Sequence, residues 1–170
     1  PLDLNDRSWV VHTQSEERPP VKIQEGAIVK DSMITDGCVI SPGARIERSI
    51  LSPGVWIGRD AFVRDSVILT DSMVEEGARV DCAILDKHVR IGKRARVGQR
   101  PKPSEAPMGI TTVGKNAQIP DRISVRRGAI IDADATPEYF SPSALRERSK
   151  ARKLRSAEAV GAATPPSAPR

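Results

Sequence analysis

The branched apolar residues of this chain return at a fixed interval that fits neither common secondary structure. They do not alternate with polar residues as in a half-buried strand, and they do not follow the spacing of an amphipathic helix. Equivalent positions instead recur every 17 residues. One series consists of Ile23, Ile40, Ile57, Val74 and Ile91, and a second of Val29, Ile46, Val63, Val80 and Val97. Such a period predicts a chain built from stacked repeats.

Further columns keep the same step. The apolar residues Met33, Ile50, Val67 and Ile84 form one column, each followed by a second aliphatic residue. A small residue recurs at Ala27, Ala44, Ala61, Ala78 and Ala95, and a serine at Ser32, Ser49 and Ser66 before Ala83. Columns that stay in register in this way indicate a solenoid, in which each repeat packs on the one before.

Within one period the branched residues lie about six apart, as Ile40 and Ile46 do, which is typical of the hexapeptide form of the parallel β-helix. Each coil would hold three short strands joined by corners, and coils would stack about 4.8 Å apart. We predict an all-β, left-handed parallel β-helix of about five to six coils. The left hand is that of known hexapeptide proteins, because the spacing does not determine it. A sandwich of short strands is the alternative.

The period also divides the chain into regions. Residues 1–22 lack it and are expected to lead in from a preceding domain, while residues 23–132 form the β-helix. Residues 99–110 contain three prolines and no periodic residue, which predicts a loop insertion within it. Residues 133–170 are expected to be a basic tail, with a short helix after Pro142 that caps the open end and a disordered terminus.

Composition narrows the function classes. Aromatic residues make up only 3% of the chain, so the interior must be aliphatic. No apolar run approaches the roughly 18 residues of a membrane span, and no leader peptide opens the chain, so we expect a cytoplasmic protein with no membrane partner. Two cysteines suit a reducing compartment, and we expect no metal site. The basic tail lacks interleaved aromatic residues, which argues against nucleic-acid binding.

Two enzyme classes with the same fold require histidines at their active sites, so the number and positions of the histidines bear on both. A three-histidine zinc site, as in γ-class carbonic anhydrase, is excluded because only His12 and His88 are present. Hexapeptide acyltransferases bind coenzyme A and use a histidine as general base. His88 shares its column with Asp71, Gly54 and Gly37, which indicates a corner residue, so acyl transfer is the less favoured alternative.

An ordered set of motifs carries a resemblance. The motifs are RPPVKI (18–23), DSMITDGCVI (31–40), RSILSPGVWIG (48–58), DSVIL (65–69), AILDKHVRIGKRARVG (83–98) and VGKNAQIPDRISVRRGAII (113–131). Together they resemble the C-terminal domain of glucose-1-phosphate adenylyltransferase, also called ADP-glucose pyrophosphorylase, over about residues 1–132. Single hexapeptides are shared by many transferases, whereas the ordered set is more specific.

The resemblance implies a parent enzyme that makes ADP-glucose and diphosphate from ATP and glucose 1-phosphate for glycogen or starch synthesis. In that family the substrates and Mg²⁺ bind to an N-terminal nucleotidyltransferase domain, where a glycine-rich loop points backbone N–H groups at phosphates. The sequence contains no such strand–loop–helix unit, so we assign no catalytic residue or cofactor and predict that this chain alone is inactive. The β-helix of another sugar-1-phosphate nucleotidyltransferase, of the GDP-mannose or UDP-sugar type, is the main alternative.

The family uses this domain for subunit contact, in tetramers, and for control by phosphorylated sugar effectors. Lys87, in the motif ILDK, stands where the family has an effector-binding Lys or Arg. The other candidates for effector phosphates are Arg90, Lys93, Arg94, Arg48 and Arg64, in a chain of net charge +5. Large apolar side chains are the candidates for protein contacts. We expect Trp56 and Phe62 to contact sister subunits, and Trp9 to contact the N-terminal domain.

Overall fold

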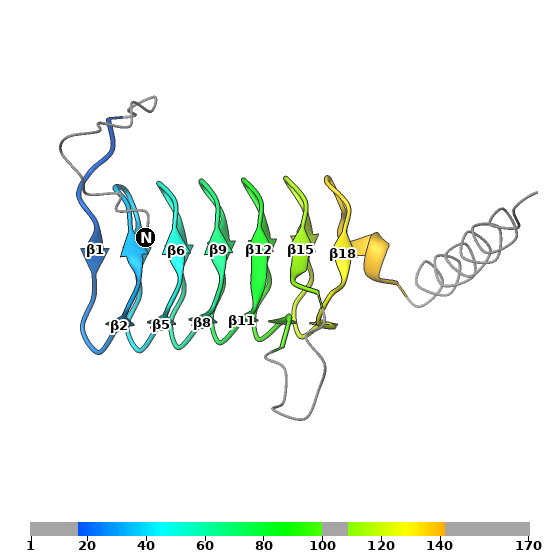
Figure 1. Cartoon of the computed structure of the whole chain (residues 1–170), viewed down its shortest axis with the longest axis horizontal. Coiled ribbons are helices and arrows are strands. Elements are labelled where there is room, and N and C mark those ends of the chain that lie inside the picture. The colour runs from blue at the N-terminus through cyan, green and yellow to red at the C-terminus, as the bar shows by residue number, and fades with distance from the viewer. Residues whose placement is uncertain (1–16, 100–108, 142–170) are drawn as a thin grey trace, which may run out of the picture.

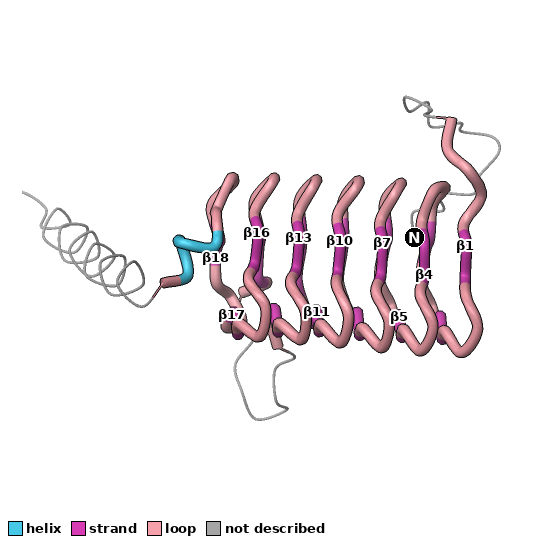
Figure 2. The backbone as a smooth tube through the Cα atoms, turned by 180° about the vertical axis from the view of Figure 1, so that it is seen from behind, coloured by secondary structure: helices cyan, strands magenta, loops and turns pink. Residues whose placement is uncertain are grey.

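The computed structural model describes residues 17–99 and 109–141, which form a three-sided prism (Figures 1 and 2). Each side is a sheet of six parallel strands. Sheet A contains β1 (Lys22–Ile23), β4 (Val39–Ile40), β7 (Trp56–Ile57), β10 (Met73–Val74), β13 (Arg90–Ile91) and β16 (Gln118–Ile119). Sheet B contains β2 (Ile28–Lys30), β5 (Arg45–Glu47), β8 (Phe62–Arg64), β11 (Arg79–Asp81), β14 (Arg96–Val97) and β17 (Ser124–Val125). Sheet C contains β3 (Met33–Ile34), β6 (Ile50–Leu51), β9 (Val67–Ile68), β12 (Ala83–Leu85), β15 (Thr111–Val113) and β18 (Ile130–Ile131).

The register of the strands confirms the repeat. Ile40 pairs with Ile57, and Met73 with Trp56, so each partner lies 17 residues along the chain. The chain visits sheets A, B and C in turn and climbs one strand per circuit, which gives the predicted left-handed hexapeptide β-helix with six coils. After β14 the step changes: Ile91 pairs with Ile119, because extra residues lie between β14 and β15.

Aliphatic columns fill the interior of the prism. Ile40, Ile57 and Val74 are fully buried, and each lies over its counterpart in the neighbouring coil. Burying one such side chain contributes about 1.5–3 kcal/mol to folding. The alanines of the small-residue column are also fully or almost fully buried from Ala44 to Ala95, and Ile123 takes their position in the last coil. Burial therefore accounts for the small residue in the four coils from Ala44 to Ala95.

Three corners per coil require a left-handed backbone. At the corner between sheets C and A, the residues Gly54, Asp71 and His88 share one column and have φ values of 74°, 55° and 58°. Glycine enters this region freely, and Asp, Asn and His do so more readily than other residues. The change from glycine to polar residues along the column therefore keeps the corner while adding a side chain.

The two ends of the prism differ. At the C-terminal end the 3₁₀ helix η1 (Pro137–Phe140) contacts β16, and Phe140 is buried against the last coil. At the other end the inward residue Ile23 is 54% exposed. Residues 1–16, the greater part of the predicted lead-in, and the helix predicted after Pro142 lie outside the described residues. The described part of the chain contains no helix suited to crossing a membrane.

Candidate functional site

The six predicted effector-binding cations lie at separate places on the prism. Arg48 and Arg64 lie where sheet B turns into sheet C, and Arg90 points outward from sheet A. Lys93 and Arg94 form the turn from sheet A to sheet B, and Lys87 lies in the turn from sheet C to sheet A. The fold therefore does not gather all six in one pocket, and each place must be considered by itself.

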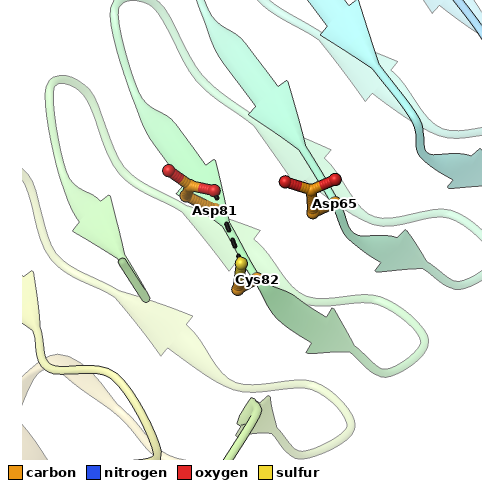
Figure 3. Close-up of side chains that lie close together, drawn as sticks. All are labelled: Asp65, Asp81 and Cys82. Carbon is orange, nitrogen blue, oxygen red and sulfur yellow. Dashed lines mark hydrogen bonds between the residues drawn. The ribbon is translucent and has the colours of Figure 1, made fainter. Parts of the chain in front are cut away.

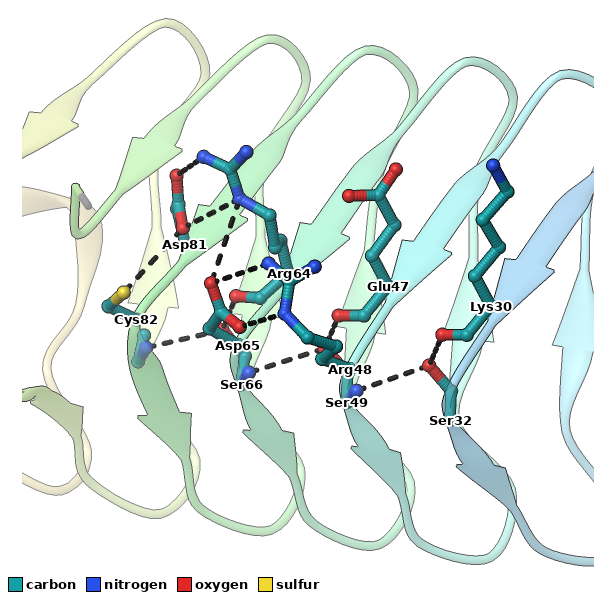
Figure 4. Close-up of polar contacts among 11 residues, drawn as sticks. Lys30, Ser32, Glu47, Arg48, Ser49, Arg64, Asp65, Ser66, Asp81 and Cys82 are labelled. Carbon is teal, nitrogen blue, oxygen red and sulfur yellow. Dashed lines mark hydrogen bonds and ion pairs between the residues drawn. The ribbon is translucent and has the colours of Figure 1, made fainter.

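At the corner between sheets B and C the cations already have partners within the chain (Figure 4). Arg48 donates to both carboxylate oxygens of Asp65, over 2.7 and 2.9 Å. Arg64 does the same to Asp81, over 3.2 and 2.5 Å, and its Nε lies 3.8 Å from Asp65. The hydrogen bond to Asp81 raises the pKa of Arg64. An effector phosphate would have to displace a carboxylate from either arginine.

A column of serines lies beneath these ion pairs and connects successive coils. The Ser49 hydroxyl donates to the carbonyl of Glu47 and accepts the backbone N–H of Ser66. The Ser66 hydroxyl repeats this arrangement with the carbonyl of Arg64 and the N–H of Ala83. Ser49 and Ser66 are nearly fully buried, so their hydroxyls satisfy backbone groups that water does not reach. The serine column seen in the sequence is thus structural.

Asp65, Asp81 and Cys82 form a group whose candidate ligand atoms lie within 4.8 Å of one another (Figure 3). Both carboxylates accept hydrogen bonds from arginines, as described above. Burial, reinforced by the charge of Asp81, raises the pKa of the Cys82 thiol. A metal ligand must be a thiolate, so these surroundings disfavour coordination. We assign the group to the ion pairs of the corner rather than to a metal centre.

On sheet A and at its turn into sheet B, two of the predicted cations face acids. Arg90 contacts the carboxylate of Glu75 at 2.7 Å, and the Lys93 ammonium lies 3.8 Å from Glu76. Lys87 differs, because within the described residues its exposed ammonium group forms no ion pair. Its backbone is fixed instead: the N–H donates to Asp86 Oδ1, and the carbonyl accepts the N–H of Asn116. Lys87 therefore combines a defined position with an available charge. Arg94 is also exposed and, over the same residues, unpaired.

The predicted contact residues lie on different sides. Trp56 is half-buried on sheet A between Val39 and Met73. Phe62 lies on sheet B, where the guanidinium carbons of Arg64 and Arg79 are 5.2 and 4.9 Å from its ring centroid. Trp9 lies outside the described residues. These contacts stay predictions, although Phe62 already has two cations against its ring.

The outward row of sheet C is an exposed apolar surface that sequence reasoning missed. This uncharged row consists of Met33, Ile50, Val67, Ile84, Thr112 and Ile130. Ile50 is 42% exposed and Ile130 75%. The sequence did contain a signal for this row, namely two successive aliphatic residues in each strand. Successive residues of a strand point to opposite faces, so one of the two must face outward.

Two exposed cations of sheet B were also missed. Arg79 and Arg96 occupy the position just before the inward Val80 and Val97, and the same column contains Arg45. Arginine at three positions of one outward column was a signal in the sequence. His88, considered for acyl transfer, is exposed at the corner between sheets C and A.

The comparisons with known proteins agree with this architecture. A family model described as "GlmU-like, C-terminal hexapeptide" matches residues 19–114. The glucose-1-phosphate adenylyltransferase of Thermomicrobium roseum is 45% identical over 172 residues, covering 82% of this chain and 34% of that protein. The enzyme of the same name from Acetivibrio thermocellus is 32% identical, with the same two coverages. The chain thus spans about a third of the length of these relatives.

A crystal structure of a candidate acetyltransferase from Desulfovibrio desulfuricans G20 superposes with a TM-score of 0.55 at 12% identity, covering 69% of this chain and 27% of that one. This likeness shows the fold alone. The resemblance to the C-terminal part of glucose-1-phosphate adenylyltransferases is confirmed, and the chain belongs to the GlmU-like C-terminal hexapeptide family.

Proposed function

We propose that this chain is the C-terminal regulatory and oligomerisation domain of a cytoplasmic glucose-1-phosphate adenylyltransferase. The whole enzyme would make ADP-glucose and diphosphate from ATP and glucose 1-phosphate for glycogen or starch synthesis. The observation that carries the proposal is that relatives of this name match 82% of the chain over only 34% of their own length. Catalysis, with its Mg²⁺, would belong to an N-terminal nucleotidyltransferase domain, so this chain alone is expected to be inactive.

A phosphorylated sugar effector would bind at the corner that carries Lys87. Lys115 follows Lys87 in the same column, since Asn116 donates to the carbonyl of Lys87 one coil away. Both lysines are exposed and, across residues 17–99 and 109–141, neither forms an ion pair. Two uncompensated ammonium groups on neighbouring coils suit a phosphoryl group, which carries close to two negative charges. Arg90, Lys93, Arg94, Arg48 and Arg64 remain secondary candidates, three of them facing acids at 2.5–2.7 Å.

Subunit contact would use the outward row of sheet C, with a second copy of this chain as the partner. Interface cores are depleted of charged residues, and this row has none over six strands. Ile84 lies near its middle and is 37% exposed. A flat parallel sheet presents such a row without interruption, so two copies could bury it against each other within a tetramer.

The effector assignment is tested in the full-length enzyme with the variant Lys87→Gln. We expect a weaker response to the activating sugar phosphate and nearly unchanged turnover without it, because Lys87 lies outside the catalytic domain. Lys30→Gln is the matched control, since Lys30 is an exposed lysine on the first strand of sheet B. An activation curve that is identical in the Lys87 variant and the wild type would remove Lys87 from the proposal.

A further inference from the structure

A cleft on sheet B, separate from the corner of Lys87, has the composition of an anion site. It has a volume of about 370 Å³ and is lined by Arg64, Arg79, Asp81, Arg96, Gln99 and Ser124, with Gly98. We propose that this cleft binds the phosphoryl group of inorganic phosphate or of a small phosphate monoester. Sheet B is the side of the prism opposite the corner between sheets C and A, so the site does not depend on the function proposed for Lys87.

Among the described residues, the cleft contains a pair of positive charges that no acid balances. Arg79 and Arg96 are direct partners in the register of β11 and β14, so two exposed guanidinium groups lie side by side on successive coils. Like charges in directly paired positions destabilise a sheet. Their other neighbours in the row are Phe62 and Ser124, neither of which carries a charge. A bound dianion would turn this repulsion into two favourable contacts.

The acid that lines the cleft is already engaged. Asp81 accepts two hydrogen bonds from Arg64 and a weaker one from the Cys82 thiol at 3.7 Å. Arg79 and Arg96 form no ion pair in the part of the chain that the structure describes. Their charges are therefore the ones available to a ligand, whereas Arg64 and Asp81 nearly cancel.

The cleft is also partly pre-organised. The guanidinium carbons of Arg64 and Arg79 lie over the Phe62 ring, at 5.2 and 4.9 Å from its centroid. Stacking on a ring restrains an arginine that would otherwise sample many rotamers. Because fewer rotamers are lost on binding, a restrained guanidinium binds an anion more tightly.

Part of the cleft is lined by uncharged groups. A Cβ atom at Gly98, where φ is 71°, would lie 2.1 Å from the carbonyl oxygen of Asp81, so this part of the lining can only be glycine backbone. The Gln99 amide and the Ser124 hydroxyl are neutral groups that could contact the hydroxyls of a phosphate ester. The volume falls within the range of sites for small molecules, about 300–1,000 Å³. Charge, shape and polarity thus agree on one class of ligand.

The test is calorimetric titration of the 170-residue chain with sodium phosphate and, separately, with glucose 1-phosphate, at constant ionic strength set with NaCl. The variants are Arg79→Gln and Arg96→Gln. Arg45→Gln is the matched control, because Arg45 is in the same outward column but on the other side of Phe62, away from the cleft. Lys87→Gln controls for the corner used in the proposed function. Circular dichroism verifies that each variant folds.

We expect saturable binding to the wild-type chain that weakens at least about tenfold in both cleft variants, as loss of a hydrogen bond to a charged group implies. The two controls should stay within about twofold of the wild type. The ligand that binds more tightly identifies the source of the phosphoryl group. In phosphate-free buffer Arg96→Gln should melt no lower than the wild type, because the repulsion is relieved.

The proposal is overturned if neither ligand binds saturably, or if Arg45→Gln weakens binding as much as the cleft variants do. The second outcome would mean that only the general positive charge attracts the anion. If Lys87→Gln alone removes binding, this cleft is wrong while the effector corner of the proposed function gains support. If only the cleft variants weaken binding, the proposed phosphate site in the cleft is supported, whether or not Lys87 binds an effector.

Discussion

The outward faces of sheets B and C have the same backbone and the same 17-residue repeat but opposite chemistry. Sheet B presents Arg45, Phe62, Arg79 and Arg96 in successive coils, whereas the corresponding row of sheet C has no charged residue. Behind both rows the inward residues are alike, as Val63 and Ile68 show, each being fully buried. The repeat thus constrains the interior, and the outward positions are free to specialise.

The difference indicates which kind of partner each face suits. A single exposed apolar residue is ordinary, but a contiguous exposed row is typical of a protein contact. A row of arginines instead favours small anions, because guanidinium groups match the geometry of phosphoryl oxygens. One rigid prism could therefore serve assembly and ligand binding on separate sides.

The largest effect on stability is expected from a substitution in the interior, which lies behind both faces. Ile57→Ala removes a fully buried side chain from the stacked column and should lower the free energy of unfolding by about 2–5 kcal/mol. Met73→Ala, an outward change one coil away, is the control and should cost much less. Urea unfolding measures both. If both variants lost the same free energy of unfolding, the inward column would contribute no more to stability than the outward residues do.

The next effect concerns sheet C alone. Ile84→Lys places a charge in the middle of the uncharged row and should weaken self-association by at least about tenfold, measured by sedimentation equilibrium. The stability of the separated chain should hardly change, because Ile84 is 37% exposed. Unaltered association in this variant would assign the contact to another side, where Trp56 on sheet A would be examined next.

A smaller effect is expected at the corner that joins the two faces. Ser66→Ala leaves the buried N–H of Ala83 without its acceptor and should lower the free energy of unfolding by about 1–3 kcal/mol. Ser52→Ala is a suitable control, because the Ser52 hydroxyl makes no hydrogen bond within the described residues. If both substitutions have the same small cost, the serine column is not a structural connection between coils.

The smallest effect on stability is expected at the corner between sheets C and A, where Arg18 pairs with Asp71. The hydrogen bond from Arg18 lowers the pKa of Asp71, so this ion pair stabilises the fold at neutral pH and is lost as the pH falls through that depressed pKa. The side chains are 22% and 36% exposed, so Asp71→Asn should cost less than about 1 kcal/mol near pH 7.

Unfolding at two pH values measures this contribution. The difference between Asp71→Asn and the wild type should shrink on acidification, because the wild-type carboxylate is then protonated too. A difference that grows as the pH falls would contradict the assigned direction of the pKa shift.

Much of the fold could be predicted because the stacking of coils repeats the same requirement at each circuit. Ile40 and Ile57 recur in the sequence for the same reason that they stack in space. The outward arginines obey no such requirement, so the recurrence of Arg45, Arg79 and Arg96 in one column marks them in the sequence without indicating what they contact. The candidate cations Arg48 and Arg64 looked available in the sequence, since their carboxylate partners become neighbours only after the chain completes a circuit.

The most direct test of the separation between the two faces measures assembly and phosphate binding on the same samples. Wild-type chain, Ile84→Lys and Arg96→Gln would each be studied by sedimentation and by phosphate titration. We predict that Ile84→Lys loses association but binds phosphate like the wild type, while Arg96→Gln associates normally and loses binding. A variant that loses both properties while remaining folded would contradict the account.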